Sequence, residues 1–180
     1  MGIAGAGNSG TVLAALFAPA LAAAFGYQAV FGLACIPLAL TLLVFTACAK
    51  EAPGRVVRKG WADYGRVLVG NRDAWWFMFF YAITFGGFAG FASALPGYFH
   101  DEFGFDPKLA GWATAACVLA GSAMRPLGGV IADRVGGTRT LLAVYLSVAL
   151  LVAAAGIGIG GPLGAVSLFV AALLWLGAGN

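Results

Sequence analysis

Long apolar runs separated by short polar stretches organise this chain. Residues 1–49, 74–99 and 140–180 contain no Asp, Glu, Lys or Arg. A bilayer core of about 30 Å needs about 20 apolar residues per helix. Six stretches of roughly this length cover residues 2–25, 28–48, 74–98, 109–131, 140–157 and 163–179. The pattern predicts an all-α integral membrane protein with six transmembrane helices.

Composition supports the same class, because 62% of the residues are hydrophobic and only 9% are charged, against about 25% charged in soluble domains. Cys35, Cys48 and Cys117 lie singly in apolar stretches, which is typical of packing residues and indicates neither a disulfide framework nor a zinc site. No metal-ligand cluster and no nucleophile–base arrangement is visible. We therefore expect no enzymatic activity, no cofactor and no bound metal.

The charged loops predict an orientation. Residues 50–73 hold six basic side chains against three acids, which places this loop in the cytoplasm by the positive-inside rule. The loop at 133–139 is again basic, whereas residues 100–108 carry three acids. Both chain ends are then cytoplasmic in an inner (plasma) membrane, and no basic segment at the start suggests a cleaved signal peptide. The net charge of +3 comes from the inner loops, so nucleic acid is not expected as a partner.

The basic loop leaves two interpretations open. Trp61, Tyr64, Val67 and Leu68 lie among its charges, a pattern suited to a helix resting on the anionic inner leaflet. A flexible connector between two membrane halves explains the same length.

A glycine-rich run opens the first apolar stretch. Residues 5–10 satisfy the G-x-G-x-x-G pattern, but no strand precedes them and no acid follows at the required distance, which excludes a dinucleotide site. Gly2, Ala6 and Gly10 recur at every fourth position, a spacing that lets helix backbones approach closely and can equally leave room for a small solute. Asn8 is then either an interhelical hydrogen-bonding residue or a ligand contact.

Arg125 is the only charged residue well inside a predicted span. Placing it there costs roughly 2.5 to 3.5 kcal/mol on insertion scales. One interpretation is that its side chain reaches the inner headgroups. The other is that it faces a cavity and binds an anion, since no acid lies within the spans to pair with it. Pro126 disfavours regular helix at Arg125 and predicts a local opening of the backbone.

Tyr81 and Phe85 stand four residues apart, so both lie on one face of the third predicted helix. Such aromatic residues serve either as packing residues or as walls of a pocket, and a tyrosine hydroxyl in lipid needs a hydrogen-bond partner. His100 ends the same span beside an acidic loop, where we expect a solvated residue and not a proton relay.

Residues 129–139 read Gly-Val-Ile-Ala-Asp-Arg-Val-Gly-Gly-Thr-Arg. This segment resembles the loop signature of the major facilitator superfamily, which occurs between helices 2 and 3 and again between helices 8 and 9. The run at residues 2–10 is similar to the glycine-rich signature of the nitrate/nitrite porter branch, found in helix 5. Both signatures place residues 74–98 in helix 7 and residues 109–131 in helix 8.

The resemblance implies roles for individual residues. Arg125 becomes the anion clamp of helix 8, Tyr81 and Phe85 line the site from helix 7, and Asn8 is the signature contact. The residues it assigns to the substrate site are Arg125, Tyr81, Phe85, Asn8, Gly5 and Gly7. The residues it assigns to a conformational-switch loop are Gly129, Asp133, Arg134, Gly137 and Arg139.

The resemblance also implies a domain organisation. Residues 1–49 would be the last two helices of the N-terminal half, 50–73 a cytoplasmic loop between halves, and 74–180 the first four helices of the C-terminal half. The chain is then expected to be a fragment of a twelve-helix transporter that needs the missing helices for activity.

The implied function is secondary active transport of nitrate or nitrite by alternating access. Its partners would be the small inorganic anion, the lipid bilayer and, if transport is proton-coupled, protons. No acid lies deep in these six spans, so proton coupling would use another part of the protein, or the porter would exchange anions. Two alternatives stay open: a facilitator for another organic anion or a drug, and a membrane scaffold that transports nothing.

Overall fold

The computed structural model describes residues 9–50, 60, 64–65 and 69–180. Regular structure in these residues is helical throughout, which confirms the all-α prediction. Most of the loop at 50–73 and residues 2–8 of the first predicted span lie outside the described residues. The helices are α2 (Ser9–Phe25), α3 (Tyr27–Cys48), α5 (Arg72–Phe103), α6 (Pro107–Val135), α7 (Gly137–Gly156) and α8 (Gly161–Ala178).

The helices have the length and apolarity of membrane spans. Within the described chain, α3, α5, α6, α7 and α8 are each long and apolar enough to cross a bilayer, and α2 contributes a shorter apolar helix over Gly10–Phe25. Large apolar side chains stay exposed along α2, α3, α5, α6 and α7. In a bilayer this surface contacts lipid, which solvates it as well as a protein core would.

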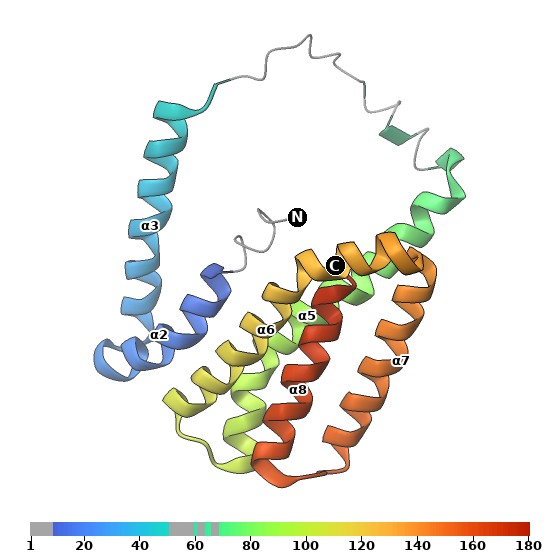
Figure 1. Cartoon of the computed structure of the whole chain (residues 1–180). Helices are drawn as coiled ribbons and strands as arrows, with labels where there is room; N and C mark the ends of the chain where they lie inside the picture. Colours follow the sequence, from blue (N-terminus) through green and yellow to red (C-terminus); the bar gives the residue numbers. More distant parts are fainter. Residues whose placement is uncertain (1–8, 51–59, 61–63, 66–68) are drawn as a thin grey trace. The chain divides into compact units, whose positions relative to one another are not determined.

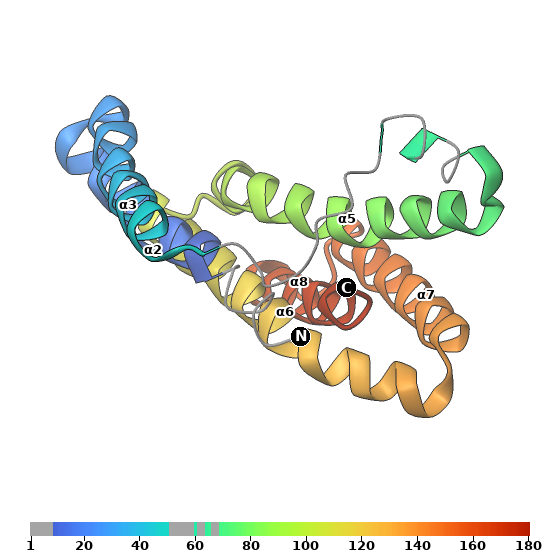
Figure 2. The same cartoon turned by 90° about the horizontal axis from the view of Figure 1, so that it is seen from above.

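By its internal contacts the chain divides into two units, Met1–Ala20 with Phe80–Asn180, and Leu21–Phe79. In the larger unit α8 is the central helix. Figure 1 shows α8 between α6 and α7, and the view from above in Figure 2 shows α5 on its remaining side. Seven residues of α8 are buried, from Ala165 to Ala178. They are almost all apolar or small, as a helix surrounded by other helices requires.

Small residues bring α6 and α8 into close contact. A Cβ atom at Gly177 would overlap the backbone of Gly121, and one at Gly128 would overlap the backbone of Ala178. Glycine alone lets two helix backbones approach this closely. The two contacts lie on α6 at either side of Arg125 and fix the position of that turn of helix.

The predicted opening of the backbone beside Arg125 was wrong. Helix α6 runs without interruption from Pro107 to Val135 and contains Pro126. Proline removes only one hydrogen bond of the helix, the one to the Ser122 carbonyl. The glycine contacts with α8 before and after this turn provide packing that keeps the helix continuous.

A tight turn joins α5 to α6. The Phe105 N–H donates to the Phe99 carbonyl (3.2 Å) and the Gly104 N–H to the His100 carbonyl (2.9 Å), with φ of 65° at Gly104, which is a glycine C-cap. Asp106 then caps α6 by accepting from the Leu109 N–H (3.0 Å). His100 is exposed, and its Nδ1 lies 2.7 Å from the Phe105 carbonyl oxygen, so it serves the turn.

The smaller unit contains α3 and the ends of its neighbours. None of the residues of α3 is buried, and the helix is apolar all round, as a span that faces lipid or other helices must be. Gly26, with φ of 81°, makes the turn that precedes it. Asn71 begins α5 by accepting from the Asp73 N–H at 3.1 Å.

Candidate functional site

A buried arginine is the centre of the candidate site. Arg125 lies on α6 between the glycine contacts at Gly121 and Gly128, and only 7% of its surface is exposed. The interpretation in which this side chain reaches the inner headgroups requires an exposed guanidinium. The burial therefore favours the other interpretation, in which Arg125 faces the interior of the helix bundle.

Two phenylalanines of α5 flank the guanidinium. The Cζ atom of Arg125 lies 5.2 Å from the ring centroid of Phe88 and 5.8 Å from that of Phe85. Both distances fall within the range of cation–π attraction. Phe88 is itself 3% exposed, and its ring fills the space that a side chain at Gly121 would otherwise take. The glycine thus admits the ring that supports the arginine.

One edge of the guanidinium lacks partners. Nε and Nη2 of Arg125 are buried and make no hydrogen bond with the described residues. These two nitrogens form one side of the planar group, and their N–H bonds run parallel. Such an edge binds two oxygens of a planar anion at once. A buried charge left without a partner is costly, so this edge has the chemistry of an anion site.

The aromatic residues predicted from the sequence are partly brought together. Tyr81 and Phe85 stack with ring centroids 5.4 Å apart and an interplanar angle of 3°, and Phe85 also contacts Arg125. Tyr81 is 57% exposed and stacks on Phe85, whose ring lies near the arginine. Thr84, between them, is buried and donates to the Phe80 carbonyl at 3.1 Å.

A cavity of about 200 Å³ opens beside the two rings. Its lining residues are Thr11, Phe85, Phe88, Ala89, Ala92 and Ser93. Thr11 comes from α2 and brings a hydroxyl to a wall that is otherwise mostly apolar. Sequence reasoning missed Thr11, although it follows Asn8 by three positions and helical spacing puts such residues on one face. Asn8, Gly5 and Gly7 lie outside the described residues.

Phe88 and Ser122 were also missed. Ser122 precedes Arg125 by three residues and is 6% exposed, and its hydroxyl has no partner among the described residues. Helical spacing from Arg125 would have singled out Ser122. Phe88 follows Phe85 by three residues, so helical spacing puts it on the same face, but the sequence does not show that its ring faces the arginine.

The predicted switch loop lies at the junction of α6 and α7. Gly136, with φ of 102° and ψ of 135°, makes the connection in a conformation that side chains other than glycine rarely adopt. Asp133, Arg134 and Arg139 are exposed. Among the described residues no group of three His, Cys, Asp or Glu side chains could hold a metal ion.

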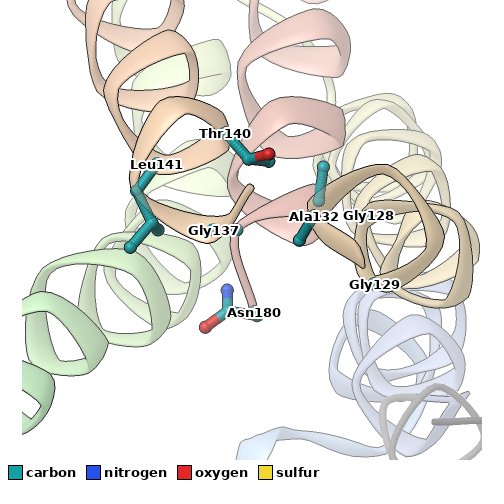
Figure 3. A pocket seen from close by; sticks show the side chains of 9 residues that line it. Gly128, Gly129, Ala132, Gly137, Thr140, Leu141 and Asn180 are labelled. Atoms are coloured by element: carbon teal, nitrogen blue, oxygen red, sulfur yellow. The ribbon is translucent and has the colours of Figure 1, made fainter. Parts of the chain in front are cut away.

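A second cavity, of about 220 Å³, lies at this junction. Its lining includes Gly129 and Gly137 of the predicted loop, with Thr140 and Asn180. Figure 3 shows the Asn180 amide in the space between the ends of α6 and α7. The two glycines leave this space open because they carry no side chain.

A bundle of apolar, membrane-spanning helices that buries an arginine beside two phenylalanine rings defines a multi-pass membrane protein. The Major Facilitator Superfamily family model matches residues 1–180. The chain belongs to this superfamily of transporters. This confirms the membrane fold and the resemblance drawn from the loop signature.

Individual proteins of known name are also similar to this chain. The chain is 32% identical over 149 residues to the "Nitrite extrusion protein" of Bacillus subtilis (strain 168), covering 83% of this chain and 38% of the relative. It is 32% identical over 184 residues to the "Probable nitrate/nitrite transporter NarK2" of Mycobacterium tuberculosis (strain ATCC 25618 / H37Rv), covering 99% and 46%. The chain therefore spans less than half the length of these relatives. No solved structure matches it.

Proposed function

We propose that the whole protein containing this chain transports nitrate or nitrite by alternating access. The observation that carries the proposal is the buried Nε–Nη2 edge of Arg125, which has no partner among the described residues. A planar oxyanion with a single charge fits this edge, because two of its oxygens match the two parallel donors. The names of the curated relatives give the same class of substrate.

The neighbouring residues complete the proposed site. Phe85 and Phe88 lie within cation–π range of the guanidinium, and the Tyr81 ring stacks on Phe85. Thr11 shares a cavity with Phe85 and Phe88 and would approach the site from α2. Asn8, Gly5 and Gly7 would add contacts from the signature segment.

We also propose the larger organisation that the resemblance implies. Residues 1–49 and 74–180 would belong to two halves that move against each other about the site, and residues 50–73 would connect them in the cytoplasm. The loop with Gly129, Asp133, Arg134, Gly137 and Arg139 would act where these movements meet the inner membrane surface.

The decisive test replaces Arg125 in the whole protein reconstituted in proteoliposomes. We expect Arg125→Ala to weaken nitrate binding by about 10- to 150-fold, the effect of losing hydrogen bonds to a charged group of about 1.5–3 kcal/mol. Arg125→Lys should also bind weakly, because an ammonium keeps the charge but loses the planar edge.

Arg72→Ala is the matched control, because Arg72 is exposed at the start of α5 and should leave nitrate binding unchanged. Competition by bulky organic anions separates this function from a general organic-anion facilitator. Unchanged nitrate uptake in Arg125→Ala would remove the basis of the proposed site.

A further inference from the structure

The hydroxyl of Ser122 makes no hydrogen bond with the described residues. The residue is 6% exposed, and its Oγ is buried without a hydrogen-bond partner among the described residues. A buried polar atom left in this state is unfavourable unless something else binds it. A serine at this buried position of α6 therefore needs an explanation other than packing.

The other buried hydroxyls of the described chain behave differently. Thr84, Thr114 and Thr140 donate to carbonyls of the preceding turn, at 3.1, 2.8 and 3.0 Å. This local bond is the usual way for a hydroxyl in an apolar helix to be satisfied. Ser122 is the exception among these buried hydroxyls, and it is the one that lies one turn from Arg125.

Helix geometry brings Ser122 close to the free edge of Arg125. Residues three apart share a face of a helix, with Cβ atoms about 5–6 Å apart. Long side chains lean toward the N-terminus of their helix, so Arg125 covers the turn that contains Ser122. Phe88 supports this placement, because its ring lies against both the guanidinium and the Gly121 position, next to Ser122 in sequence.

We propose that Ser122 is a third hydrogen-bond donor in the anion site and makes it prefer nitrate to nitrite. The inference rests on the proposed function. The Nε–Nη2 edge of Arg125 takes two oxygens of either anion. Nitrate has a third oxygen, which accepts from the Ser122 hydroxyl, whereas nitrite has none to offer there. Ser122 is thus a specificity-determining residue that acts beside the arginine.

The test compares nitrate and nitrite in the whole protein, with Ser122→Ala and Ser122→Thr. We expect Ser122→Ala to raise the half-saturation concentration for nitrate by about 2- to 12-fold, the loss of one hydrogen bond, and that for nitrite by less than about 2-fold. Ser122→Thr retains the donor and should retain the preference. Ser167→Ala is the control, because its exposed hydroxyl bonds to the Leu163 carbonyl on α8.

Equal shifts for both anions, or no shift for either, would overturn the role of Ser122. Ser122→Cys keeps the size of the side chain with a weak donor, and should show the same selective loss if the alanine variant is poorly folded. The two proposals fail separately. If Arg125→Ala weakens nitrate binding and Ser122→Ala does not, only the Ser122 proposal is wrong. If neither substitution weakens nitrate binding, the proposed anion site itself is wrong.

Discussion

Arg125 is a charged residue that is buried, and its immediate neighbours offset only part of the free-energy cost of that burial. Phe85 and Phe88 offer it the faces of two rings, which satisfy charge but not hydrogen-bond donors. The Nε and Nη2 atoms have no partner among the described residues, and the proposed anion would bind there. An anion that fills this edge would satisfy both needs at once.

Phe88 should control how firmly Arg125 is held. Replacing it in the whole protein with leucine removes the ring face closest to the guanidinium. We expect Phe88→Leu to weaken nitrate binding by about 2- to 30-fold, corresponding to a cation–π contribution of about 0.5–2 kcal/mol. Nitrate half-saturation in proteoliposomes measures this effect.

Phe91→Leu is the control for that change, because Phe91 packs on Phe169 of α8, 5.6 Å between ring centroids, and away from the arginine. It should leave nitrate half-saturation within about twofold, since it breaks an aromatic pair and no cation–π contact. Equal losses in both variants would mean that Phe88 acts by packing alone.

Arg125 could be predicted as a site residue from the sequence, since any charge inside an apolar span needs an explanation. The contact between Phe88 and Arg125 could not be predicted in the same way. The chain contains 14 phenylalanines, and which ring faces the guanidinium depends on the rotation of α5 about its axis. Tyr81 shows the converse. Helical spacing correctly paired Tyr81 with Phe85, but it did not predict that Tyr81 would be 57% exposed.

Elements are positioned here by glycine as much as by large apolar side chains. Helices α6 and α8 meet through Gly121, Gly128 and Gly177, and this contact sets the depth at which Arg125 is buried. Sequence reasoning assigned close helix packing to residues 2–10, most of which lie outside the described residues. It did not identify the α6–α8 contact, because its glycines are far apart in sequence.

Gly177→Ala should separate the two helices. The added Cβ would overlap the Gly121 backbone, which cannot move aside as a flexible side chain would. We expect a loss of stability of about 1–3 kcal/mol, typical of overpacking, measured by thermal unfolding of the whole protein in detergent.

Gly86→Ala is the matched control on α5, where a new Cβ meets no atom within 4 Å. This variant should be neutral or stabilised by up to about 1 kcal/mol, because alanine favours the helix. Equal stability of the two variants would show that the α6–α8 contact tolerates separation.

At the scale of the whole molecule, the charged loops predict how the helices cross the membrane. The loop of residues 100–108 is acidic and the loop of residues 133–139 is basic. These two segments lie at opposite ends of α6. The positive-inside rule then predicts that the first faces outward and the second the cytoplasm.

Thiol labelling tests this orientation. In a whole protein with Cys35, Cys48 and Cys117 replaced by serine or alanine, a cysteine at Asp101 should react with a membrane-impermeant reagent in intact cells. A cysteine at Arg134 should react only after the membrane is opened, because the reagent cannot cross it. The reverse result would invert the proposed topology.

Charge segregation and hydropathy determined the class of this protein from its sequence, because burying a charge in lipid is costly wherever it falls. The approximate positions of the membrane spans could be predicted from the same charge segregation. The tertiary structure decided that α6 continues through Pro126 and that the Phe88 ring lies near Arg125. It also decided that the buried Ser122 hydroxyl has no partner among the described residues. These facts depend on helix rotation and on glycine contacts between distant segments, which a linear pattern does not contain.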